Sequence, residues 1–147
     1  MEINMFSKKF FCNTIFIVSL STPPLVANAG FDTYNHTNED SSVRITSGDY
    51  KPCSMDFGIY TPKQNSDGTA GHSSANDSQI KALCVTSKNN LCTANIYNTN
   101  NCTGKIVGHA ELNLQTYKIS SVASDDSRYS FNNQNGTRLD ITYTNPL

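Results

Sequence analysis

Four cysteines behind an export leader limit the fold of this protein more than any other feature of its sequence. The chain has five cysteines, and the first, Cys12, lies inside the leader. An even number of cysteines in a secreted chain predicts a disulfide framework. We therefore expect a small domain held together by two disulfides among the remaining cysteines, which are Cys53, Cys84, Cys92 and Cys102.

Residues 1–29 have the pattern of a signal peptide. Lys8 and Lys9 supply the positive charge, an apolar run follows, and Ala27-Asn28-Ala29 offers the small-x-small pattern that a signal peptidase reads. The apolar run is about eleven residues, whereas a bilayer span needs roughly twenty. We therefore expect cleavage after Ala29, no stable membrane span afterwards, and export to the periplasm or to the outside of the cell as one domain, residues 30–147.

Composition limits both the core and the partners. Asn, Ser and Thr make up about a third of residues 30–147, and large aliphatic residues are few, which predicts a thin core that needs the disulfides. The formal net charge of the whole chain is −1. Because nucleic-acid binding depends on a basic surface, no nucleic-acid partner is expected.

The second half of the chain has the pattern of short strands separated by turns. We expect strands at 80–86, 91–97, 105–114 and 117–122, with a bulge in the last because Ile119 and Val122 break the alternation. No helix of ten residues with an apolar stripe follows the leader. The predicted fold class is all-β, a small antiparallel β-sandwich or Greek key of about six to eight strands.

The first half of the mature chain is more polar. Residues 30–49 are expected to be a loosely ordered entry segment with an edge strand at 43–45. Residues 55–60 read as a second strand, which Pro62 ends. Residues 63–78 are rich in Gly, Ser, Asn and Asp, and they predict a long exposed loop of the kind that carries function or is mobile.

The last hairpin has a register that side-chain parity can test. A two-residue turn at Asn135-Gly136 would put Phe131 opposite a carboxylate, whereas a three-residue loop with Gly136 left-handed pairs Phe131 with Leu139. We favour the three-residue loop Gln134-Asn135-Gly136. It gives one apolar face, made of Tyr129, Phe131, Leu139, Ile141 and Tyr143.

Strand geometry selects among the three possible disulfide pairings. If 80–86 and 91–97 form a hairpin centred on Lys88, Cys84 and Cys92 stand opposite each other at disulfide distance. Cys102 then pairs with Cys53. A bend near Ala94 would instead let Cys92 reach Cys102 and leave Cys53 for Cys84.

A stretch over residues 96–122 resembles the first hairpin and closing strand of a βγ-crystallin Greek key. Tyr97 and Gly104 match the family's aromatic and glycine, and Ser120-Ser121 match its Ser-Ser pair. Cys102 stands where the family has a second aromatic residue. The resemblance implies a Greek key hairpin in this region.

The same resemblance bears on calcium. In the family, two acidic or amide residues ahead of the Ser-Ser pair help to bind calcium, which requires several oxygen ligands. Here those positions hold Thr116 and Tyr117. The resemblance therefore implies little or no calcium binding by this loop.

Other motifs for metals and catalysis are weak. The three histidines, His36, His72 and His109, lack the His/Cys spacing of a zinc site, so no metal or other cofactor is expected. His109 falls on the solvated face of a strand. His72 lies beside Ser73 and Ser74, but adjacency in a loop does not position a base on a nucleophile. Asp125-Asp126 is typical of a turn.

These observations favour a non-catalytic exported binding module over an enzyme. Its partner would be a protein or a glycan, bound through a tyrosine-bearing face or the 63–78 loop, with His72, His109 and Tyr60 as candidate binding residues. In composition the chain resembles small Asn/Ser-rich exported proteins of intracellular gram-negative bacteria, which implies a virulence or host-interaction factor. The alternatives are a secreted enzyme inhibitor that uses the exposed loop and, less favoured, a small hydrolase.

Overall fold

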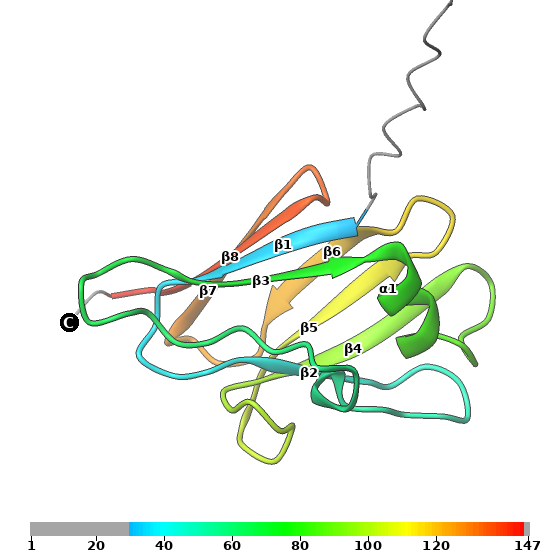
Figure 1. Cartoon of the computed structure of the whole chain (residues 1–147), viewed down its shortest axis with the longest axis horizontal. Helices are drawn as coiled ribbons and strands as arrows, with labels where there is room; N and C mark the ends of the chain where they lie inside the picture. Colours follow the sequence, from blue (N-terminus) through cyan, green and yellow to red (C-terminus); the bar gives the residue numbers. More distant parts are fainter. Residues whose placement is uncertain (1–29, 146–147) are drawn as a thin grey trace, which may run out of the picture.

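Two four-stranded sheets pack against each other in this protein (Figure 1). The computed structural model describes residues 30–145. The predicted leader, residues 1–29, lies outside the described residues. One sheet has the order β3-β1-β8-β7 and the other β2-β4-β5-β6. The strands are β1 (Gly30–Asn35), β2 (Ser42–Ile45), β3 (Gly71–Asn76), β4 (Leu91–Tyr97), β5 (Ile106–Asn113), β6 (Lys118–Ser124), β7 (Tyr129–Gln134) and β8 (Arg138–Tyr143). The prediction of a small disulfide-stapled all-β fold is confirmed.

One strand pair departs from the expected antiparallel arrangement. β1 is antiparallel to β3 but parallel to β8. Strands joined by a tight hairpin must be antiparallel, whereas β1 and β8 are far apart in the sequence and no hairpin fixes their relative direction. The sheet is therefore mixed.

The expectation of a loosely ordered segment over residues 30–49 is wrong. β1 is a central strand, paired on both sides, and β2 includes the expected edge strand at 43–45. The sequence pattern does not indicate a central strand here, because some of the polar residues of β1 are buried and form hydrogen bonds within the protein. Asn35 is fully buried, and its side chain donates to the Glu39 carbonyl (2.7 Å) and accepts from the Thr37 amide (3.0 Å).

The expected strand at 80–86 is also wrong, because α1 (Asp77–Leu83) occupies most of that segment. Asn76 caps the helix, and its side chain accepts from the Gln79 amide while the Gln79 side chain accepts from the Asn76 amide. Ile80 and Leu83 are buried. They are three positions apart, and this spacing suits one helix face as well as a fully buried strand.

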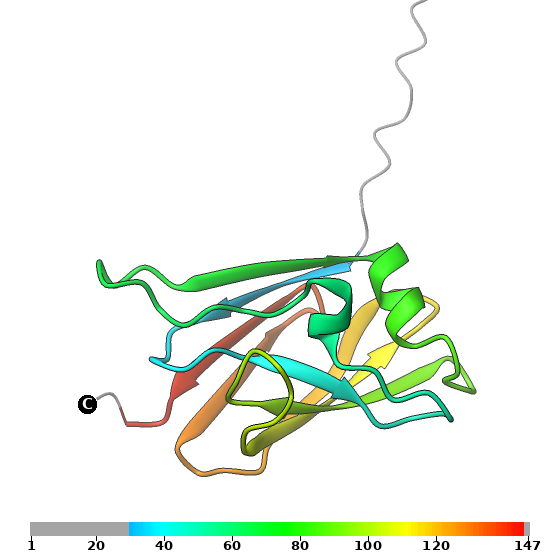
Figure 2. The same cartoon turned by 60° about the horizontal axis from the view of Figure 1, so that its bottom comes forward.

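Two further segments differ from expectation. The strand expected at 55–60 is a 3₁₀ turn, η1 (Ser54–Phe57), which Gly58 ends in the left-handed conformation. The loop expected over 63–78 is shorter, because β3 begins at Gly71 and pairs with β1. η1 lies beside α1, whereas the loop before β3 projects at one end of the molecule (Figure 2).

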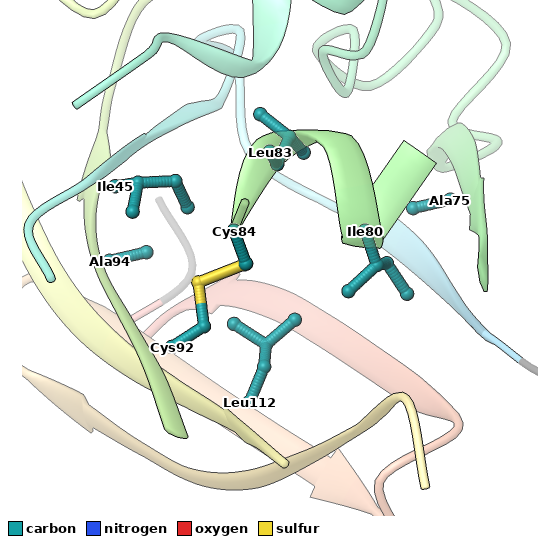
Figure 3. Packing of buried hydrophobic residues seen from close by; sticks show 8 residues of the cluster. All are labelled: Ile45, Ala75, Ile80, Leu83, Cys84, Cys92, Ala94 and Leu112. Carbon is teal, nitrogen blue, oxygen red and sulfur yellow. A yellow bond between two sulfur atoms is a disulfide. The ribbon is translucent and has the colours of Figure 1, made fainter. Parts of the chain in front are cut away.

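The disulfides are Cys53–Cys102 and Cys84–Cys92, with Cα separations of 6.0 and 5.8 Å. Both predicted pairs are present, but the hairpin that predicted them is not. Cys84 is the residue that ends α1, and the disulfide ties this helix to β4. Figure 3 shows this bond inside one core cluster, which contains Ile45, Ala75, Ile80, Leu83, Cys84, Cys92, Ala94 and Leu112.

The second core cluster confirms the predicted apolar face of the last hairpin. Tyr129, Leu139 and Ile141 are buried in it, with Phe131 and Tyr143 packed against it. The loop has three residues as predicted, but it runs from Asn135 to Thr137, so Phe131 pairs with Ile141. Asn135 and Gly136 both have positive φ (55° and 74°), which moves the loop one residue along the chain.

Two other predictions concern β6 and membrane spans. The β5–β6 register shifts beside Leu112, as expected for the predicted bulge. Within residues 30–145, the structure contains no helix of the length and apolarity that a bilayer crossing requires.

Candidate functional site

Loops from both sheets meet at the end of the sandwich where β8 ends (Figure 1). They include the segment after β1, the loop before β3 and the turn between β6 and β7. At this end the surface has a hollow of about 570 Å³, within the usual size range of ligand sites. We call it the Glu39 cleft, and it is lined by Asn38, Glu39, Ser127, Arg128, Tyr143 and Asn145.

Glu39 occupies a fixed position in this cleft. Its carbonyl accepts hydrogen bonds from the buried Asn35 and Thr37 side chains (2.7 and 3.1 Å), which tie the loop to the end of β1. Its carboxylate accepts from the hydroxyls of Tyr129 and Tyr143 and from the Asn98 amide (3.0 Å). These donors come from β7, β8 and the turn after β4, so one carboxylate joins both sheets.

The two tyrosines are held as hydrogen-bond donors. Burial and the hydrogen bond to Glu39 raise the pKa of the Tyr129 hydroxyl, and burial with the nearby Glu39 charge raises that of Tyr143. Their rings pack at 5.4 Å between centroids. The one hydroxyl proton of Tyr143 is shared between the Glu39 carboxylate and the side-chain oxygen of Asn38. Tyr129 is buried, whereas Tyr143 lines the cleft.

Arg128 also lines the cleft and is held in place by hydrogen bonds. Its Nε and Nη2 donate to Asp126 Oδ2 (3.2 and 2.9 Å), and the Lys105 ammonium donates to the same oxygen (2.8 Å). These hydrogen bonds hold the pKa of the buried Asp126 well below its ordinary value. The guanidinium lies 5.5 Å from the Tyr129 ring centroid. Asp125-Asp126 is therefore a turn, as predicted, but Asp126 also positions a residue of the cleft.

This arrangement is suited to holding a polar ligand by hydrogen bonds. The six lining residues supply amide, hydroxyl, carboxylate and guanidinium groups that converge on one hollow. Glu39 is the one carboxylate among them. A paired-carboxylate mechanism needs a second acid flanking the same bond, and the lining of this cleft does not supply it.

His72 lies away from the cleft, on the outer face of the β3-β1-β8-β7 sheet. Its Nε2 is 3.1 Å from Asp32 Oδ1, and its ring is 4.7 Å from that of Tyr34. The adjacent Ser73 points to the other side of the strand, where its Oγ is 2.6 Å from that of Thr61. The structure therefore does not bring His72 and Ser73 together.

The other two candidate binding residues are also separate from the cleft. His109 is exposed on β5, as predicted, with Nδ1 3.1 Å from Asp125 Oδ1. Tyr60 is half-buried and lines an apolar cavity of about 70 Å³ between the sheets. The three side chains do not share a site.

The residues of the crystallin-like stretch have structural positions. Tyr97 ends β4, and a Cβ on Gly104 would lie 2.4 Å from the Thr99 side chain, so this turn requires glycine. Ser120 and Ser121 lie on β6 and bond to Glu111. Among residues 30–145, no three His, Cys, Asp or Glu side chains come together as a metal site.

Sequence reasoning missed Glu39 and Arg128. Glu39 lies in the segment expected to be loosely ordered, and nothing local in the sequence indicates that its carboxylate meets residues about 90 positions away. The available signal was Tyr129 and Tyr143, because strand parity placed both on one buried face, where their hydroxyls need partners.

The fold and this site define a class, a small disulfide-stapled β-sandwich with a polar cleft at one end. No family model and no curated protein matches the chain. Among solved structures, the chain is similar to NttC, described as a substrate of the type II secretion system of Legionella pneumophila. The TM-score is 0.59 at 20% sequence identity, over 80% of this chain and 100% of the other. The likeness is one of fold.

Proposed function

We propose that this protein is an exported, non-catalytic binding module whose ligand site is the Glu39 cleft. The observation that carries the proposal is the convergence of polar side chains, fixed by buried partners, on one hollow surface. A site that is ordered before binding loses less conformational entropy when its ligand arrives. The geometry supports recognition, because the lining of the cleft offers converging hydrogen-bonding groups and no arranged pair of nucleophile and base.

Export is supported by three features. The leader pattern over residues 1–29 directs a chain to a secretory pathway. Two disulfides form and persist in oxidising compartments. The solved structure of similar fold is described as a secretion-system substrate. We propose a role in contact with host or competitor surfaces, with a glycan or a protein as the partner.

The function is tested with arrays of immobilised glycans and peptides, probed with labelled protein of residues 30–147. We expect binding to some of these probes that is lost in Asn38→Ala and kept in Asn132→Ala, which removes an exposed amide from the outer face of β7. Binding that both variants keep would place the ligand site elsewhere. Conversion of a bound probe into a product would contradict the non-catalytic proposal.

One observation favours enzyme inhibition as a second candidate function. The loop at residues 63–70 is exposed, yet it is held by its own hydrogen bonds, from the Asn65 amide to the Thr69 carbonyl (2.9 Å) and from the Gln64 side chain to the Gly68 carbonyl (2.8 Å). The Gln64 amide also donates to the Thr37 carbonyl (2.8 Å), beside the cleft. A rigid protruding loop suits insertion into an active site.

Inhibition is tested against a panel of secreted proteases and glycosidases. A loop inhibitor should block one of them in proportion to its concentration, and replacement of residues 65–69 by a Gly/Ser linker should abolish the effect. If the enzymes keep full activity at micromolar protein, the second candidate is lost.

A further inference from the structure

The proposed function does not specify the chemical class of the ligand. The residues that line the Glu39 cleft favour one class. We infer that its ligand is an uncharged saccharide, held through two neighbouring hydroxyls between the Glu39 carboxylate and the Arg128 guanidinium. This inference rests on the proposed function and names the ligand class of the same site.

Hydrogen-bond capacity is the first argument. An ionised carboxylate has about four lone-pair positions, and Glu39 uses three of them for Tyr129, Tyr143 and Asn98. Arg128 has five N–H donors, and its bonds to Asp126 engage Nε and Nη2 and leave the Nη1 donors available. One acceptor position on Glu39 and three donors on Arg128, two on Nη1 and one on Nη2, therefore remain among the residues that line the cleft. A hydroxyl both donates and accepts, so two adjacent hydroxyls can bond to the Glu39 carboxylate and to the Arg128 guanidinium at once.

Charge balance is the second argument. Of the cleft residues and their ion-pair partners, Glu39 and Asp126 are negative and Arg128 and Lys105 are positive, so these four groups sum to zero. An anionic ligand that reached Arg128 would also meet the carboxylate of Glu39. A cationic ligand that reached Glu39 would meet the guanidinium. A neutral ligand with many hydroxyls gains from both groups without either repulsion.

Rigidity and surface type are the third argument. Glu39 is fixed by donors from three elements, and Arg128 is fixed by Asp126 and by the Tyr129 ring. Tyr143 adds an aromatic surface beside these polar groups. A saccharide presents C–H surface next to its hydroxyls, and an aromatic side chain offers both apolar area and a polar tip. The size of the cleft, about 570 Å³, accommodates a terminal sugar unit.

The experiment is titration calorimetry of the folded domain, residues 30–147, with named probes. The neutral probes are the methyl glycosides of glucose, galactose, mannose and N-acetylglucosamine. The comparison probes are sialyllactose, which is anionic, and an uncharged Gly/Ser/Asn hexapeptide. We expect at least one neutral glycoside to bind, and its analogue lacking one of the two adjacent hydroxyls to bind about tenfold or more weakly, because a hydrogen bond to a charged group is lost.

Two matched pairs of variants locate the contact. Arg128→Lys keeps the charge but removes the fork of donors, and its control is Arg138→Lys, where the arginine bonds to Asp140 two residues away in the same manner but on the outer sheet face. Glu39→Gln is matched by Glu111→Gln on β5. The cleft variants should weaken glycoside binding about tenfold or more, and the controls should leave it unchanged. Circular dichroism of each variant confirms that it is folded.

The possible outcomes separate the two proposals. If the hexapeptide binds in a manner that depends on Arg128 and no glycoside binds, the cleft remains the ligand site but the saccharide inference is overturned. Equal binding of sialyllactose and a neutral glycoside overturns the argument from charge. Glycoside binding that both cleft variants keep would contradict the proposed site itself, and the absence of glycoside binding up to millimolar concentration overturns the inference.

Discussion

Glu39 shows how a single side chain acquires a role from distant residues. Its neighbours Asn35 and Thr37 are buried polar residues whose side chains bond to each other and to the Glu39 carbonyl, and they set the loop so that the carboxylate turns toward β7 and β8. Tyr129 supplies one of the donors from inside the core. The stability of this end of the molecule and the proposed binding site therefore depend on the same contacts.

Tyr129→Phe tests this link. The substitution keeps the buried ring and removes the hydroxyl that donates to Glu39, so the free energy of unfolding should fall by about 1.5–3 kcal/mol, the usual value for a hydrogen bond to a charged group. Urea denaturation measures it. The control is Tyr50→Phe, because Tyr50 is 47% exposed, and it should leave stability nearly unchanged. Equal stability of both variants would show that the Tyr129–Glu39 bond contributes little.

Two buried aspartates, Asp126 and Asp140, predict a response to acid. Hydrogen bonds from Arg128 and Lys105 lower the pKa of Asp126, and those from Arg138 lower that of Asp140. A carboxyl whose pKa is lower in the folded state stabilises the fold above its unfolded pKa, about 4, and this stabilisation is lost as the pH falls through the folded value. We therefore expect the melting temperature to fall progressively below about pH 4.

The double variant Asp126→Asn/Asp140→Asn should be less stable at pH 7 and show a flatter profile below about pH 4, since the two titrating groups are gone. Asp49→Asn, at an exposed turn, should keep the steep profile. Thermal melts between pH 7 and pH 2 give both curves. An unchanged slope in the double variant would mean that other carboxyls control acid unfolding.

At the scale of elements, sequence periodicity succeeded where one face of a strand is apolar and failed where it is not. The apolar face of the β7–β8 hairpin followed from parity, as did the bulge in β6. β1 was missed because Thr33 and Asn35, which face inward, are polar and satisfied by hydrogen bonds. α1 was missed because Ile80 and Leu83 fit a buried strand as well as a short helix, and the cap at Asn76 decides between them.

The cap at Asn76 gives an element-scale prediction. Asn76→Ala removes the acceptor for the Gln79 amide and should lower the free energy of unfolding by about 1 kcal/mol. Asn76→Ser, which can still cap, should recover most of the loss. Chemical denaturation of the three proteins measures this, and identical midpoints would show that the Cys84–Cys92 disulfide and packing alone fix the helix.

At the scale of the whole molecule, the two disulfides join segments of the chain that share only a thin hydrophobic core. Cys53–Cys102 spans a sequence separation of 49 residues and Cys84–Cys92 one of 8. In the chain-entropy description, the longer loop stabilises by about 4 kcal/mol and the shorter by about 2.5 kcal/mol. Cys53→Ser/Cys102→Ser should therefore lower stability more than Cys84→Ser/Cys92→Ser does. The reverse order in denaturation experiments would show that the packing of α1 around its disulfide outweighs the loop term.

The site depends on this same long-range assembly, which is why the sequence predicted only part of it. Tyr129 and Tyr143 could be placed on one face from the sequence. Their contact with Glu39, however, requires β1 to pair with β8, and no hairpin in the sequence indicates this long-range pairing. The histidines attracted attention as reactive residues, yet each lies beside an aspartate, the buried Asp140 for His36 and the exposed Asp32 and Asp125 for the other two, and none of the three lines the cleft.

The most direct measurement of the central claim is the map of amide chemical shifts in the folded domain on titration with a bound glycoside or peptide. We predict that the largest chemical-shift changes fall on the backbone amides of residues that line the Glu39 cleft, which are Asn38, Glu39, Ser127, Arg128 and Tyr143. Changes centred instead on His72 and Tyr34, on the outer face of the β3-β1-β8-β7 sheet, would contradict it.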